Sequence, residues 1–195
     1  PYKGLSVSRL KKQPHGVDLG PLQSQLPNAL KHKDKSIHLN LEFYFKDLTR
    51  LKARFNDSEM SQAAQEKDQA LLIGRRDLRT NNSWMHNSQR MVKGKNRCTL
   101  MIHPSHAARL NITNGDTVLV QSRVNQVKIE AQLSDEVMDG VVSIPHGWGH
   151  GKAGMKLSVA SAHAGVSVND LTDEGFLDEL SGNAAVNGVP VALCL

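Results

Sequence analysis

The order of apolar and polar residues changes character near residue 68. Residues 1–40 are rich in Pro, Gly, Lys and Gln and show no sustained period, which predicts an extended, weakly ordered arm. Residues 41–55 carry apolar side chains three and four positions apart, which predicts an amphipathic helix. The polar residues 56–68 that follow are typical of a linker.

The rest of the chain consists of short apolar runs separated by Gly, Asn and Pro turns, a pattern that favours a barrel or a sandwich. One short helix is expected from Pro104 through Leu110, because Pro is favoured at the first helical position. The predicted strands are 70–73, 99–103, 117–122, 127–133, 141–144 and 189–195, with the third and fourth forming a hairpin. We therefore divide the chain into an N-terminal arm with helix and linker (1–67), the remnant of a preceding domain, and a β domain (68–195).

Composition narrows this picture. Only 4% of the residues are aromatic, so the core of the domain must be built from aliphatic side chains. No apolar run is long enough to span a bilayer, and no signal peptide is visible, so we expect a cytoplasmic protein. Because the sequence starts at Pro1, we expect a piece of a longer protein. Cys98 and Cys194 lack metal-type spacing and suggest free thiols in a reducing compartment, although one disulfide stays open.

The net charge of +5 is distributed unevenly. Residues 1–67 hold twelve Lys and Arg against seven Asp and Glu, whereas residues 68–195 hold twelve of each. Within the second region, residues 75–97 contain seven basic side chains and a single acid, Asp77. A local basic loop suits a small anionic ligand better than a long polyanion, so we do not expect nucleic acid as a partner.

The first candidate binding segment, residues 74–90, directly follows a predicted strand. Its sequence, GRRDLRTNNSWMHNSQR, has no apolar period, so it is a connection and not part of the core. Arg offers forked donors for phosphate or carbonyl groups, and Asn and Ser offer donors and acceptors for the edge of a heterocycle. A solvated surface loop is the alternative.

The second candidate segment is PHGWGHGKAG, residues 145–154, which also follows a strand. Its glycines would let the backbone approach a ligand closely, and His146 and Trp148 offer a polar and a planar contact. The run from Gly149 to Gly154 matches the G-x-G-x-x-G fingerprint, with Asp170 near the position of the ribose acid. That motif must open a helix, and the β-branched, Gly-containing sequence that follows argues against one.

Metal and nucleophile chemistry find little support. His103 and His106, and His146 and His150, lack an accompanying carboxylate or Cys at a recognised spacing, and we expect His103 and His106 at the surface. Neither cysteine has a histidine nearby in sequence that would complete a dyad.

A weaker candidate segment is VNDLTD, residues 168–173. Its Asn and Thr could contact a base. The alternative is a helix N-cap, in which Asp or Thr precedes a helix over EGFLDEL.

The order of these segments resembles the C-terminal dinucleotide-binding domain of the molybdopterin oxidoreductases, which include formate dehydrogenases, nitrate reductases and dimethyl sulfoxide reductase-like enzymes. The resemblance covers about residues 70–195 and is most specific around HPSHAARLNITNGDTVLVQSR. The upstream stretch HGVDLGPL, residues 15–22, also looks like what precedes this domain in the family. The other segments that carry it are GRRDLRTNNSWMHN, VKIEAQLSDEVMDGVVSIPHGWGHG, VNDLTD and LSGNAAVNGVPVAL.

This resemblance implies a six-stranded double-psi β-barrel with flanking helices that contacts a pterin guanine dinucleotide. The first segment would supply most of the contacts, the second would add four, and one would come from the weaker segment. Carried over by position, the cofactor-binding residues would be Gly74, Arg76, Arg79, Thr80, Asn81, Asn82, Ser83, His86, His146, Gly147, Trp148, Gly149 and Asn169.

The resemblance also implies what lies elsewhere. The family's metal ligand (Cys, selenocysteine, Ser or Asp) and its iron–sulfur motif belong to earlier domains, so no catalytic residue and no metal ligand is expected here. The implied cofactors of the full-length enzyme are molybdopterin guanine dinucleotide with Mo or W and a [4Fe-4S] cluster. The implied partners are the remaining domains of the same polypeptide and other redox subunits. The substrate class implied is formate dehydrogenase-like or nitrate reductase-like.

Two other classes of function stay open on the residues alone. A basic, nucleic-acid-binding β-barrel would use the charged arm and loop, and would show salt-sensitive affinity. A self-contained enzyme on the same fold would need an acid–base pair or a nucleophile, and we identify none.

Overall fold

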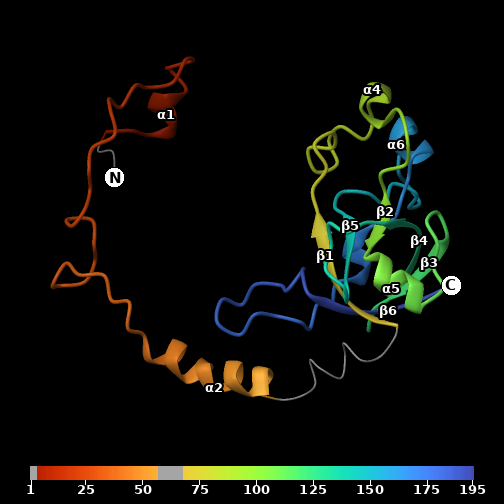
Figure 1. The fold of residues 1–195 in the computed structure, drawn as a ribbon. Helices are drawn as coiled ribbons and strands as arrows, with labels where there is room; N and C mark the ends of the chain where they lie inside the picture. Colours follow the sequence, from red (N-terminus) through yellow and green to blue (C-terminus); the bar gives the residue numbers. More distant parts are fainter. Residues whose placement is uncertain (1–3, 57–67) are drawn as a thin grey trace. The chain divides into compact units, whose positions relative to one another are not determined.

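A computed structural model describes residues 4–56 and 68–195 (Figure 1). The chain forms two units, residues 1–42 and residues 43–195, which are described separately below. The predicted linker lies almost wholly outside the described residues.

The described residues of the first unit form mainly turns and extended segments, and most of their side chains are exposed. Its one helix among the described residues, α1 (Val7–Leu10), begins after Ser6, whose hydroxyl accepts a hydrogen bond from the Arg9 amide.

Helix α2 (Glu42–Asn56), which belongs to the second unit from Phe43 onward, confirms the helix predicted from the apolar spacing. Its Phe45 and Leu48 side chains are exposed in this structure.

The second unit contains a closed barrel of six strands (Figure 1), which confirms the predicted barrel. The strands are β1 (Gln69–Arg75), β2 (Thr99–Ile102), β3 (Thr117–Gln121), β4 (Gln126–Leu133), β5 (Val141–Pro145) and β6 (Val189–Cys194). Around the barrel their order is β1-β5-β2-β4-β3-β6. The pairs β1–β5 and β2–β4 are parallel, and the other neighbours are antiparallel, including the predicted hairpin β3–β4.

The barrel interior is aliphatic, as the low aromatic content requires. Alternation places Ile129 and Ala131 of β4 inside and their neighbours Lys128 and Glu130 outside. Strand β2 is buried at all four positions, so its side chains meet protein on both faces. The fully buried side chains include Leu72, Leu100, Ile102, Val118, Val120, Val142, Ile144, Val191 and Leu193.

Short helices pack around the barrel. Helix α5 (Pro104–Arg109) starts at the predicted proline, and the side chain of His103 accepts a hydrogen bond from the Ser105 amide. The expected surface position of His106 is wrong: its side chain is only 1% exposed. His106 and Ala107 share the buried side of α5, and a six-residue helix packed on a barrel leaves little surface on that side.

The remaining helical elements are α4 (Gln89–Val92), α6 (Ser158–Ala162) and the 3-10 helix η1 (Val168–Leu171). The predicted helix over EGFLDEL is absent from the described residues, so the N-cap interpretation is wrong. The Thr172 hydroxyl donates backwards to the Asn169 carbonyl, and Asp173 pairs with Arg123. Both cysteines are free, which confirms the thiol prediction.

Truncating Leu100 tests the closed aliphatic core. Leu100→Ala should lower the free energy of unfolding by about 2–5 kcal/mol, because the lost contacts leave a cavity that the barrel cannot refill. Urea unfolding of the 195-residue chain, followed by circular dichroism, measures this. The matched control is Leu78→Ala, at a fully exposed position, which should change the value by less than about 0.5 kcal/mol. Equal effects of the two variants would contradict the core assignment.

Candidate functional site

The parallel pairing of β1 and β5 brings the two main candidate segments together. Gly74 pairs with Ile144 and Arg75 with Pro145, and the His146 amide donates to the Arg75 carbonyl over 2.9 Å. Both strands therefore end at the same rim of the barrel. The first loop (residues 76–88) and the second loop (residues 146–157) leave that rim side by side.

The two loops touch through their backbones. A Cβ atom on Gly147 would lie 2.2 Å from the Asn82 carbonyl oxygen, so only glycine fits at this contact. Gly147 also has a φ of +94°, a conformation that L side chains rarely adopt. On the other side of the contact, Asn81 and Asn82 both have positive φ, which asparagine tolerates better than most residues.

A third connection joins the far ends of the loops. The Asn87 side-chain oxygen accepts hydrogen bonds from the Val159 and Ala160 amides at the start of α6, over 3.1 and 3.2 Å. This is the capping geometry that satisfies exposed amides at a helix start. Figure 1 accordingly shows α4 and α6, which follow the two loops, at one end of the barrel.

A cavity of about 340 Å³ lies at this rim. It receives residues from four segments that are distant in sequence, namely the end of β1, the start of the second loop, η1 and the residues before β6. Its lining residues are Gly74, Arg76, His146, Val168, Asn169, Val186 and Asn187. Four of the predicted site residues, Gly74, Arg76, His146 and Asn169, therefore line one cavity.

Asn187 is a cavity residue that the sequence did not single out. Its side-chain oxygen accepts a hydrogen bond from the Gly74 amide over 2.8 Å, and the neighbouring Gly188 amide donates to the Leu72 carbonyl. These bonds fix the segment before β6 against the end of β1. The signal available in the sequence was the asparagine of the NGVP turn directly before the last strand.

Arg76 reaches across the first loop, where its guanidinium donates to the Asn82 side-chain oxygen. Other predicted contacts serve the loop itself. Arg79 donates to the Arg90 carbonyl over 2.7 Å, and the buried Thr80 hydroxyl donates to the Asp77 carbonyl over 2.9 Å. Arg79 and Thr80 thus shape the first loop and lie outside the cavity lining.

A buried pair of histidines connects the two loops. His86 Nδ1 of the first loop is 2.6 Å from His150 Nε2 of the second, and the rings meet edge to face. The His86 ring also packs against Trp148, with centroids 4.0 Å apart. His86, His150 and Trp148 are 1%, 7% and 8% exposed, and the Trp148 ring packs in the core.

Burial keeps this pair neutral. Burial, followed by the neighbouring His150, lowers the pKa of His86 from 6.5 to about 4. Burial also lowers the pKa of His150. Two neutral imidazoles can share one hydrogen bond, with one ring as donor and the other as acceptor, whereas two imidazolium rings would repel each other. His150 is the second residue that the sequence did not assign to the site.

The remaining predicted residues have other positions. Asn81 is exposed and Ser83 half-buried at the turn of the first loop. At Gly149 a Cβ atom would lie 2.7 Å from that of Ser167, so this glycine packs the second loop against the segment before η1. No helix follows the G-x-G-x-x-G run until Ser158. This confirms that the run is not the glycine-rich fingerprint that opens a helix in Rossmann-type dinucleotide sites. No described helix is long and apolar enough to cross a membrane.

Known proteins show similarity to parts of this chain. It is 29% identical over 121 residues to ArrA, the molybdopterin-containing subunit of the arsenate respiratory reductase of Chrysiogenes arsenatis, covering 60% of this chain and 14% of the relative. It is 28% identical over 109 residues to a tetrathionate reductase subunit from Salmonella typhimurium, covering 47% of this chain and 11% of that protein. The chain thus spans less than a seventh of the length of either relative.

Among solved structures, acetylene hydratase from Pelobacter acetylenicus has a similar fold. The TM-score is 0.56 with 19% sequence identity, and the match covers 69% of this chain and 19% of that one. The profile of one protein family, described as the molydopterin dinucleotide binding domain, matches residues 71–190, which run from within β1 to the start of β6. The chain therefore belongs to the molydopterin dinucleotide binding domain family.

Proposed function

We propose that the rim cavity and the two loops hold part of a pterin guanine dinucleotide. The observation that carries this proposal is the convergence of Gly74, Arg76, His146 and Asn169 on one cavity. These residues come from three separate segments, and the sequence resemblance predicts each of them as a cofactor contact. Membership of the dinucleotide-binding family supports the same function.

The chemistry of the cavity fits such a ligand. Arg76 supplies a guanidinium for a phosphate group, and Asn169 and Asn187 supply amide donors and acceptors for a base edge. None of the described residues that line the cavity carries a carboxylate, which would repel a pyrophosphate. A volume of about 340 Å³ is at the lower end of the range for ligand pockets, so the cavity would hold one part of the dinucleotide.

The other predicted residues are then assigned supporting parts. Gly147 lets the loops meet, Asn82 orients Arg76, and Arg79 and Thr80 hold the first loop in shape. His86 and His150 connect the two loops to each other. Asn81 and Ser83 lie at the turn of the first loop, Trp148 packs against His86, and Gly149 packs the second loop against Ser167.

The relatives support a proposal for the activity of a whole protein containing this domain. We propose an oxidoreductase in which the bound pterin carries Mo or W as the redox centre and the residues of this chain orient and shield the dinucleotide. Both curated relatives are named as reductases, which favours a reductase over the formate dehydrogenase-like alternative. The [4Fe-4S] cluster, the other redox subunits, the contacts with further domains and the cytoplasmic location belong to this proposal as well.

Binding of guanosine diphosphate, the nucleotide half of the cofactor, tests the site directly. Titration into the ¹⁵N-labelled 195-residue chain should shift the amide resonances of Gly74, Asn169 and Asn187. We expect affinity weaker than micromolar, because the cavity contacts only one part of the ligand. Arg76→Ala should weaken binding by roughly tenfold, because a charge-assisted bond to phosphate is lost.

The matched control is Arg109→Ala, which removes an exposed arginine of α5 that pairs with Asp139. It should leave the affinity unchanged. Shifts confined to the arm, or equal losses in the two variants, would contradict the site. Tight and salt-sensitive binding of generic DNA would instead support the nucleic-acid alternative.

The neutral histidine pair predicts a pH dependence of stability. Between about pH 6.5 and about pH 4 the unfolded chain binds a proton on His86 that the folded chain does not bind, so the free energy of unfolding should fall as the pH falls through this window. Below about pH 4 both states are protonated and this contribution stops changing. Urea unfolding at a series of pH values measures the slope.

His86→Gln should flatten that slope relative to the parent chain, whatever its effect at neutral pH, and His150→Gln provides a second variant if the first folds poorly. The control is His163→Gln at an exposed position, which should leave the slope as it is. Parallel pH profiles for the parent and both pair variants would exclude a neutral, shared hydrogen bond.

A further inference from the structure

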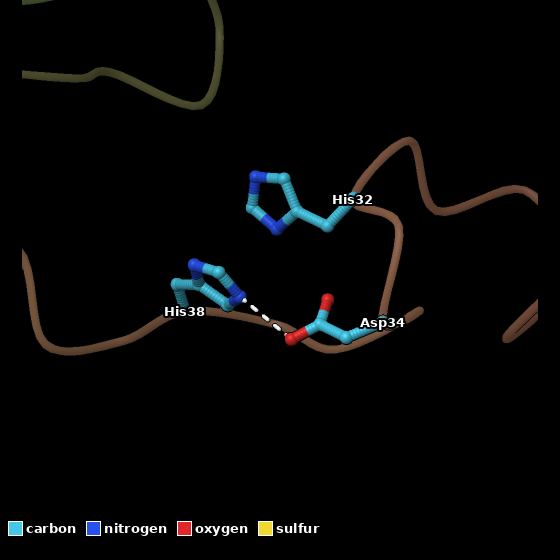
Figure 2. Close-up of side chains that lie close together, drawn as sticks. All are labelled: His32, Asp34 and His38. Carbon is cyan, nitrogen blue, oxygen red and sulfur yellow. Dashed lines mark hydrogen bonds and ion pairs between the residues drawn. The ribbon is translucent and has the colours of Figure 1, made fainter.

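A cluster of three potential metal ligands lies in the first unit. His32, Asp34 and His38 each offer one ligand atom, and these three atoms lie within 4.8 Å of one another. Figure 2 shows the three side chains gathered at one turn, with the Asp34 carboxylate facing His38. This is the one group of its kind within residues 4–56 and 68–195.

The turn that carries these ligands is held by its own hydrogen bonds. The Ser36 hydroxyl and amide both donate to Asp34, over 2.5 and 3.2 Å. His38 Nε2 is 3.1 Å from Asp34 Oδ2, and His32 Nδ1 is 3.2 Å from the Ser36 carbonyl. The His32 and His38 rings lie 4.1 Å apart between centroids. The ligands are thus close together before any ion binds.

We propose that His32, Asp34 and His38 form a binding site for a late first-row divalent metal ion such as Zn²⁺. Two imidazole nitrogens and one carboxylate oxygen suit Zn²⁺, Ni²⁺ or Cu²⁺, whereas Mg²⁺ and Ca²⁺ prefer sites made of oxygen alone. Ligand bonds of about 2.0–2.2 Å require only a small contraction of the cluster. Three protein ligands leave at least one coordination position for water.

Local charge sets the expected strength. Lys31, Lys33 and Lys35 flank the ligands and oppose a cation. The Lys35 ammonium donates to the Leu30 and Asn28 carbonyl oxygens, over 2.6 and 3.2 Å, which bends the segment back on itself. The ligands are also exposed, so solvent screens the repulsion. Binding in the micromolar range is therefore expected, weaker than in buried structural zinc sites.

The test is calorimetric titration of ZnCl₂ into the tag-free 195-residue chain at neutral pH, with MgCl₂ as the comparison ion. One equivalent of Zn²⁺ should bind with roughly micromolar affinity, and Mg²⁺ should show no comparable heat. The double variant His32→Ala/His38→Ala should lose at least about tenfold in affinity, and Asp34→Asn should show a smaller loss. With Cu²⁺ as probe, paramagnetic resonance should show coupling to two nitrogens in the parent but not in the double variant.

The matched control is His15→Ala, which removes another exposed histidine of the same unit and should bind Zn²⁺ like the parent. Circular dichroism should show that every variant keeps the unfolding midpoint of the parent, because the substituted side chains are exposed. No uptake of Zn²⁺ by the parent, unchanged uptake by the double variant, or equal binding of Mg²⁺ would each overturn the proposal. None of these outcomes depends on the dinucleotide site.

Discussion

The parallel pairing of β1 with β5 is the constraint on which the site depends. A parallel pair ends both strands at the same rim, so the loops that follow must start as neighbours although about seventy residues separate them. The antiparallel pairing of β6 with β1 then brings Asn187 to the same place, because β6 begins where β1 ends. The position of the cavity is therefore set by the order of the strands in the barrel. The loop residues determine which chemical groups line it.

For the two loops to make contact at the rim, their backbones must come close together. Side chains must also fill the space between them so that water is excluded. Gly147 provides the proximity, since any Cβ there would collide with Asn82. The side chains that fill this space are two imidazoles and an indole. They are unusual because the barrel interior itself is aliphatic. A neutral histidine pair satisfies one polar atom of each ring and packs like a small aromatic residue, so it can join the loops without introducing buried charge.

Sequence periodicity placed all six strands and helix α5 to within one or two residues, because alternation and proline positions are local properties. The predicted cofactor-binding residues came from the resemblance to a family, and four of them line one cavity in the structure. Asn187 was not identified from the sequence, because its hydrogen bond to Gly74 spans 113 residues and forms only when β1 and β6 pair. The surface prediction for His106 was wrong, and the burial of His150 was not predicted, for a related reason: the burial of a polar ring is decided by the element it packs against and not by its neighbours in the chain.

The basic segment 75–97 shows how charge counted along a sequence differs from charge available to a ligand. Arg75 donates to the Thr99 carbonyl and hydroxyl, Arg79 to the Arg90 carbonyl, and Arg97 to the Met91 carbonyl while pairing with Asp77. These three guanidinium groups donate hydrogen bonds to backbone oxygens where regular secondary structure ends, and in this way they stabilise the segment. Arg76 is exposed, lines the cavity and, within the described part of the chain, bonds to a neutral amide, so its charge is left for a ligand. Of the seven basic residues of the segment, Arg76 is therefore the one placed to contact an anion in the rim cavity.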